Sequence, residues 1–177
     1  MYAVASGVRT MWFDMRKEDL GFVERAPVVH VSEGTVAIPR ARVFATFTDP
    51  HSWPHWFPNV RAVSYTGAPP YGVGTIRQAH VGSTHWVEEI IAWETDVRWA
   101  WTVTRASVPF AHAQVEAFEF SDVGDATCVR WTLALEPRLL ARMGAPFAPR
   151  VIERLFGRAM PNLRAYVQRP AAPPTAG

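Results

Sequence analysis

The sequence predicts an α+β fold, in which one antiparallel sheet wraps around one long helix near the C-terminus. Residues 139–168 carry apolar side chains at a repeat of four residues, which is typical of a long helix with one buried face. Between Val28 and Pro137 the chain reads mainly as short strand-like segments. These segments follow one another with short breaks, and this favours antiparallel neighbours.

Length and composition are those of one globular domain. The chain has 177 residues, of which 49% are hydrophobic, so it is long and apolar enough to build a core. No apolar run is long enough to cross a bilayer, and the N-terminus lacks the basic start of a secretory signal. The single cysteine, Cys128, excludes an internal disulfide. We therefore expect a cytoplasmic protein.

The C-terminal helix carries one wide apolar stripe. Its positions are Met143, Phe147, Val151, Leu155, Ala159, Leu163 and Val167, with Ile152, Phe156 and Met160 beside them. Proline near the start is tolerated in a first helical turn, so the regular helix should begin near Pro149. Pro161 interrupts the stripe without ending it, which predicts a bend centred on residues 157–161. Such a bend would hold Phe156 and Met160 over the sheet as a pliable lid.

Positive charge gathers on the other face of this helix. Residues 138–169 hold seven arginines against Glu153 alone, although the whole chain has a net charge of only +2. A solvated helix face is the simpler interpretation. Alternatively, Arg150, Arg154 and Arg158 could make a weak contact with an anionic membrane or an acidic protein. Nucleic acid is not indicated, because no basic stretch is interleaved with aromatic residues.

The remaining elements are predicted in chain order. Residues 1–27 form an arm that packs on the domain, residues 28–168 form the domain, and residues 169–177 form a disordered tail. Apolar spacing predicts a helix at 40–48, and the proline-rich segment 49–58 predicts a short irregular helix. The predicted strands are 28–38, 60–66, 75–81, 85–93, 98–104, 111–120 and 127–135.

Several short motifs in this order resemble the polyketide cyclase/dehydrase branch of the START-like (SRPBCC) superfamily. They are Val36-Ala37-Ile38-Pro39-Arg40-Ala41-Arg42-Val43-Phe44, Asp49-Pro50, Trp53-Pro54-His55-Trp56-Phe57-Pro58, Gly72-Val73-Gly74-Thr75 and the segment EEIIAWE at 88–94. The resemblance implies the helix-grip (Bet v 1-like) fold, with a curved seven-stranded antiparallel sheet and two short helices after the first strand. It also implies an apolar ligand between sheet and helix. Some members are cyclases, aromatases or dehydratases, and many are carriers.

Strand alternation then selects the side chains that face such a ligand. On the strand at 85–93, Trp86, Glu88 and Ile90 share one face, whereas Val87, Ile91 and Trp93 form a rival apolar set. We assign Trp86, Glu88 and Ile90 to the concave face of the sheet. The candidate ligand-binding residues are Trp56, Phe57, Arg77, Trp86, Glu88, Trp99, Trp101, His112, Gln114, Glu116, Phe118, Trp131, Phe156 and Met160.

Three of these residues are candidates for acid–base chemistry, namely Glu88, Glu116 and His112. A carboxyl group among aromatic rings has its charged form disfavoured, so it could transfer protons or orient a ligand hydroxyl or carbonyl. Alternatively, each could pair with Arg77, sit at a cavity mouth or point outward. If Glu88 or Glu116 is buried, replacing it with glutamine should keep or raise the stability.

No cofactor or metal is expected. His51 and His55 are four residues apart, but Pro54 breaks the helix that would align them. The segment at 72–74 lacks the third glycine of a dinucleotide-binding motif.

Three functions remain open. They are a binding protein for a lipid-like or polyketide-like molecule, a cyclase, aromatase or dehydratase acting on such a molecule, and an interaction module that uses the basic helix face.

Overall fold

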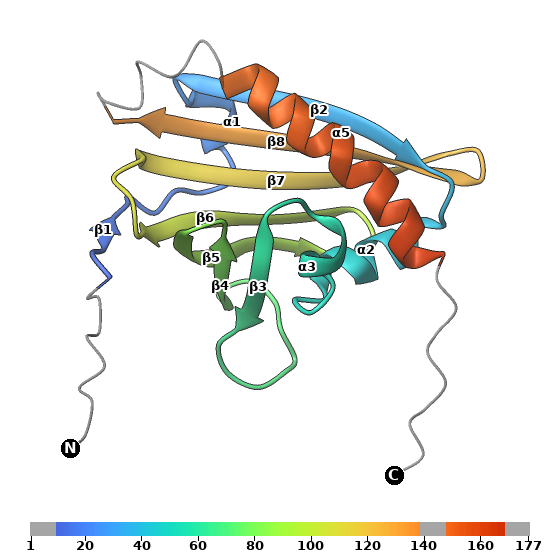
Figure 1. Cartoon of the computed structure of the whole chain (residues 1–177), viewed down its shortest axis with the longest axis horizontal. Helices are drawn as coiled ribbons and strands as arrows, with labels where there is room; N and C mark the ends of the chain where they lie inside the picture. The colour runs from blue at the N-terminus through green and yellow to red at the C-terminus, as the bar shows by residue number, and fades with distance from the viewer. Residues whose placement is uncertain (1–9, 139–147, 169–177) are drawn as a thin grey trace, which may run out of the picture.

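The computed structural model describes residues 10–138 and 148–168. One antiparallel sheet has the strand order β2-β8-β7-β6-β5-β4-β3, and α5 (Ala148–Val167) crosses it (Figure 1). The strands are β2 (Val28–Val36), β3 (Val60–Tyr65), β4 (Ile76–Val81), β5 (Thr84–Glu94), β6 (Arg98–Ala106), β7 (Ala111–Val123) and β8 (Ala126–Pro137). The predicted α+β fold, with an antiparallel sheet and a C-terminal helix, is therefore confirmed.

Two short helices, α2 (Arg40–Thr48) and α3 (Trp53–Trp56), follow β2. The prolines at 50, 54 and 58 leave room for only one helical turn in α3. Both tryptophans of that turn are buried, and each indole N–H has an acceptor. Trp53 Nε1 donates to the carbonyl of Phe47 at 2.7 Å, and Trp56 Nε1 donates to Ser52 Oγ at 3.1 Å.

The long helix α5 continues through Pro161 to Val167. Within the described part of the stripe, Phe156, Ala159, Met160, Leu163 and Val167 are buried. The stripe positions Met143 and Phe147 lie outside the described residues, as does the tail at 169–177. Arg150, Arg154 and Arg158 are exposed. The bend near Pro161 and the docking of the arginines to an anionic partner stay predictions.

The arm fills a split in the sheet. Pairing of β6 with β7 ends at Thr102 and Val115, and β1 (Phe13–Asp14) pairs with the freed edge of β6. Next to it, the backbone N–H of Arg16 donates to the carbonyl of His112 on β7 at 2.7 Å. The helix α1 (Phe22–Arg25) then lays Phe22 against Ala113, Val115 and Ala134 on the convex face.

Two bulges decide which side chains face inward. The pairing of β5 with β6 shifts between Ile90 and Ala92, so Trp93 returns to the same core as Ile90, while Ile91 packs on the convex side. Both predicted sets on this strand therefore contribute to the core. A second shift, between Ala111 and Ala113, leaves His112 exposed instead of facing inward with Gln114.

Helix α5 approaches the sheet closely at Gly34 of β2. A Cβ atom at this position would lie 2.6 Å from Met160 Cγ, which is closer than carbon atoms can pack, and 3.2 Å from Phe156 Cε1, which is a tight contact. We expect Gly34→Ala to lower the free energy of unfolding by about 1–3 kcal/mol, because the helix must shift outward. Urea unfolding measures this. Gly72→Ala is the control, since a Cβ there meets no atom within 4 Å. Equal unfolding midpoints for the two variants would contradict the close approach.

Candidate functional site

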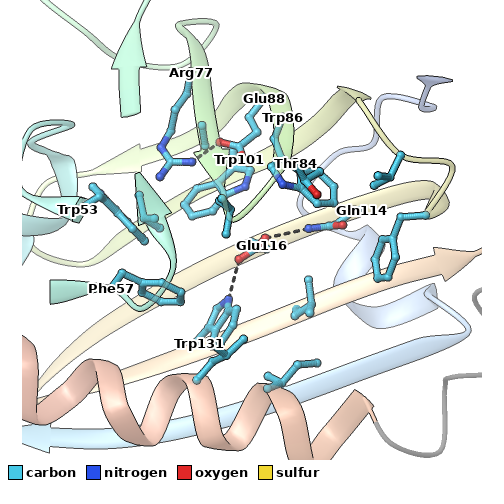
Figure 2. Close-up of a pocket in the computed structure, with 18 residues that line it drawn as sticks. Trp53, Phe57, Arg77, Thr84, Trp86, Glu88, Trp101, Gln114, Glu116 and Trp131 are labelled. Carbon is cyan, nitrogen blue, oxygen red and sulfur yellow. Dashed lines mark hydrogen bonds and ion pairs between the residues drawn. The ribbon is translucent and has the colours of Figure 1, made fainter. Parts of the chain in front are cut away.

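A cavity of about 330 Å³ lies between the concave face of the sheet, α3 and α5 (Figure 2). Most of its lining is apolar, and the polar residues sit on β4, β5 and β7. The lining residues are Trp53, Phe57, Val60, Arg77, Ala79, Val81, Thr84, Trp86, Glu88, Trp101, Val108, Phe110, Gln114, Glu116, Trp131, Leu133, Ile152 and Leu155. The concave face is thus partly unfilled, because one helix cannot cover a curved sheet.

A buried ion pair forms one wall. Arg77 on β4 and Glu88 on β5 are directly opposite in the ladder, and Arg77 Nη1 donates to Glu88 Oε2. Their side chains are 3% and 6% exposed. The guanidinium carbon lies 4.7 Å from the ring centre of Trp53 and 4.6 Å from that of Trp101, so two indoles flank the cation. Burial raises the pKa of Glu88, and the charge of Arg77 opposes this rise.

Glu116 on β7 is the second carboxyl group in the cavity wall, where it is half-buried, and it forms no ion pair with any described residue. Gln114 Nε2 donates to its Oε1 at 2.8 Å, and Trp131 Nε1 donates to its Oε2 at 3.0 Å (Figure 2). Burial raises the pKa of Glu116 to about 7, and the nearby charge of Glu88 adds to the rise. This carboxyl group therefore exchanges a proton near neutral pH, and it lines the cavity.

Three buried polar atoms on lining residues have no partner within the described part of the chain. They are two donors, Arg77 Nε and the indole nitrogen of Trp101, and one acceptor, the amide oxygen of Gln114. A buried polar group without a hydrogen bond costs roughly 1–3 kcal/mol. A ligand that supplied a matching acceptor or donor here would recover part of that free energy.

The structure brings eight of the fourteen candidate ligand-binding residues to the cavity. They are Phe57, Arg77, Trp86, Glu88, Trp101, Gln114, Glu116 and Trp131. Five others are buried in the core without lining the cavity, namely Trp56, Trp99, Phe118, Phe156 and Met160. His112 is exposed and lies outside the lining. Glu88 and Glu116 thus remain as acid–base candidates at the cavity, and His112 does not.

Sequence reasoning missed the residues that the loops and the helix contribute. Val108 and Phe110 precede β7, and Trp53 precedes the predicted Phe57 on α3. Val108 and Phe110 reach the cavity because of the loop path before β7, for which alternation gives no signal, and Phe110 is still 38% exposed. Ile152 and Leu155, in contrast, lie on the predicted apolar stripe of α5. The apolar pattern therefore predicted that Ile152 and Leu155 are on the buried face, but Phe156 and Met160, one turn further along, were selected as the ligand-binding residues.

The histidines do not build a metal centre. Among the described residues, no three His, Cys, Asp or Glu side chains gather at metal-binding distance. The ring of His55 stacks on Tyr166 at 5.5 Å between centres, and the rings of His80 and His85 stack at 4.0 Å.

Within residues 10–138 and 148–168, no helix combines the length and apolarity that crossing a membrane requires.

A long helix across a curved antiparallel sheet, with a cavity between them, is the START-like fold. Residues 28–168 match the family described as "Polyketide cyclase / dehydrase and lipid transport", and the chain belongs to this family. The resemblance noted in the sequence is therefore confirmed.

Similar proteins of known sequence or structure agree with this assignment. An uncharacterized protein of Mycobacterium tuberculosis is 28% identical over 148 residues, which cover 83% of this chain and 89% of that protein. A START superfamily protein from Mycobacterium smegmatis superposes with a TM-score of 0.66 at 13% identity, covering 79% of this chain and 97% of that one. A Thermobifida fusca protein solved by NMR gives a TM-score of 0.62 at 23% identity, covering 78% and 92%.

Proposed function

We propose that the protein binds an apolar or amphipathic small molecule, of the lipid or polyketide-like kind, in the cavity between the sheet and α5. One observation carries this proposal: the cavity has walls of aromatic and aliphatic side chains and a few buried polar groups that converge in it. Its volume of about 330 Å³ is at the lower end of the usual range for ligand pockets, roughly 300–1,000 Å³. The size suits a compact molecule or a single acyl chain.

Filling the cavity should abolish binding. Ala79 is buried on β4 and lines the cavity, so the ring of Ala79→Phe would occupy ligand space. We expect an environment-sensitive apolar dye to bind the wild type with micromolar affinity and to bind this variant about tenfold or more weakly. Leu155→Trp should do the same from the helix side.

Val29→Phe is the matched control, because Val29 is 41% exposed on β2 and does not line the cavity. Titration of dye fluorescence gives the affinities, and thermal unfolding shows that each variant is folded. The proposal would be contradicted if the wild type bound no dye, or if the folded cavity variants bound the dye as well as the wild type does.

Glu116 favours a second candidate function, a cyclase, aromatase or dehydratase that acts on the bound molecule. Its pKa of about 7 makes it suited to both taking and giving a proton at neutral pH. The carboxyl group lies in the cavity lining and is held by two neutral donors, Gln114 and Trp131. Such a reaction needs the proton transfer to occur within hydrogen-bond reach of the bound substrate.

A pH–rate profile would separate the enzyme from the carrier. If Glu116 is the base, turnover should rise with pH through about 7, and Glu116→Gln should lower kcat by about 100-fold or more. Affinity for the substrate should change far less than kcat. This role would be contradicted if the variant retained wild-type turnover, or if the rate were independent of pH between 5 and 9. The ligand-binding function would then remain as the proposal.

A further inference from the structure

The cavity holds three ionisable side chains, Arg77, Glu88 and Glu116. The only cation among them is already engaged. Arg77 is paired with Glu88 through Nη1, and its guanidinium group lies between the indoles of Trp53 and Trp101. Its Nε has no partner among the described residues, but the side chain is only 3% exposed, so little of the cation is available to a ligand. Apart from this buried Nε, an anionic ligand could reach the cation only by displacing Glu88 from the pair, at the desolvation cost of a buried carboxylate.

The charge of Glu116, in contrast, has no counter-charge in direct contact. Both of its recorded partners, Gln114 and Trp131, are neutral donors. Among the described residues, the neighbouring elements add no cation to the lining: β8 contributes Trp131 and Leu133, and α5 contributes Ile152 and Leu155. With Glu116 ionised, the described lining carries a net charge of −1.

Two further features favour a cation at this place. Trp86, Trp101, Trp131 and other aromatic rings line the same cavity, and the faces of such rings attract positive charge. The amide oxygen of Gln114 has no partner in residues 10–138 and 148–168, and the amide nitrogen of Gln114 lies 2.8 Å from Glu116 Oε1. The Gln114 amide oxygen, which lacks a donor, therefore lies near the Glu116 carboxylate, which lacks a counter-charge in direct contact.

We infer that the preferred ligand has an apolar body with a basic amine as its polar end, and that the cavity discriminates against carboxylate ends such as those of fatty acids. The protonated amine would donate to Glu116 and to the amide oxygen of Gln114, and its apolar body would lie among the aromatic and aliphatic walls. This inference rests on the proposed ligand-binding function and adds the chemical class of the ligand.

A matched series of probes tests the choice of polar end. Decylamine, decanol and decanoate each have an unbranched chain of ten carbons and differ in the polar group at its end. Each is titrated against the dye-loaded protein at pH 8, where Glu116 is mostly ionised and an alkylamine is still protonated. We expect decylamine to displace the dye best and decanol next, with decanoate at least about tenfold weaker than decylamine.

Two variants locate the preference. Glu116→Gln keeps the volume and removes the charge, so the ratio of amine to carboxylate affinity should fall about fivefold or more. Glu89→Gln makes the same charge change on β5, but Glu89 is paired with Lys17 outside the cavity, so the ratio should stay as in the wild type.

The outcomes separate this inference from the function on which it rests. Decanoate that binds as well as decylamine, or a ratio that Glu116→Gln leaves unchanged, would overturn the amine preference while ligand binding stands. If neither the dye nor any of the three probes binds, the proposed function fails and the inference fails with it.

Discussion

Glu88→Gln is expected to lose about 3–5 kcal/mol of the free energy of unfolding, the largest stability effect of any single substitution proposed for this protein. The side chains of Arg77 and Glu88 are 3% and 6% exposed, so water cannot replace the lost carboxylate. The glutamine would leave a buried guanidinium charge without a counter-charge, and arginine does not give up its proton. Urea unfolding at pH 7 measures the loss.

The partner substitution should cost less. Arg77→Met leaves Glu88 buried and unpaired, but a carboxyl group can take up a proton and lose its charge, which limits the penalty. The double variant Arg77→Met with Glu88→Leu removes both charges and should recover most of the loss, to within about 1–2 kcal/mol of the wild type. If the double variant were as unstable as Glu88→Gln, or if Glu88→Gln were as stable as the wild type, the buried pair would not have the role assigned to it.

This expectation reverses the one drawn from sequence for Glu88. Sequence alternation placed Glu88 correctly on the concave face, and from burial alone a glutamine there keeps or raises stability. The register of β4 with β5 sets Arg77 opposite Glu88, and that pairing changes the sign of the effect. The sign therefore depends on which residues lie opposite each other across two strands, which a single strand's pattern does not contain.

The parts of the fold that follow a period could be predicted from the sequence. The stripe of α5 and the alternation on β6, β7 and β8 correctly predicted inward positions such as Trp101, Glu116 and Trp131. The pattern failed at bulges. His112 lies where the pairing of β7 with β8 shifts, and one extra residue turns its side chain away from the cavity.

The periodic pattern of the sequence also does not predict where α5 lies along the sheet. The α5 stripe is apolar along its whole length, so the pattern shows which face of the helix is buried but not which of its residues lie over the cavity. The close contact of Met160 and Phe156 with Gly34 fixes that position. These two side chains therefore fill the space above β2, and Ile152 and Leu155 cover the cavity instead.

Glu116→Gln is expected to act in the opposite direction to Glu88→Gln and to depend on pH. The pKa of Glu116 is about 7 in the folded protein, against 4.5 as its ordinary value. The folded state therefore holds this proton more tightly than the unfolded state. Below about pH 4.5 the group is protonated in both states and has no effect on stability. Between pH 4.5 and 7 it lowers the stability progressively, and above pH 7 the full cost, on the order of 2–3 kcal/mol, is present.

Glutamine at this position cannot ionise, so the cost should vanish. Its carbonyl can accept from Trp131, and its amide can donate to the unpaired oxygen of Gln114, which replaces the lost contact with Gln114 Nε2. The difference in the free energy of unfolding between variant and wild type should thus be near zero at pH 4 and should rise to about 2–3 kcal/mol in favour of the variant at pH 8. Urea unfolding across this range measures the difference.

Glu119→Gln is the control on the same strand, since Glu119 is 43% exposed beside Arg98 and its removal should change stability by no more than about 0.5 kcal/mol at any pH. A Glu116→Gln difference that is flat from pH 4 to pH 8 would show that the carboxyl group titrates as an ordinary glutamate. It would then neither exchange protons near neutral pH nor lie in a desolvated cavity. A rising difference would identify Glu116 as the group that the fold keeps at a cost in stability, which is the pattern expected of a residue retained for its function.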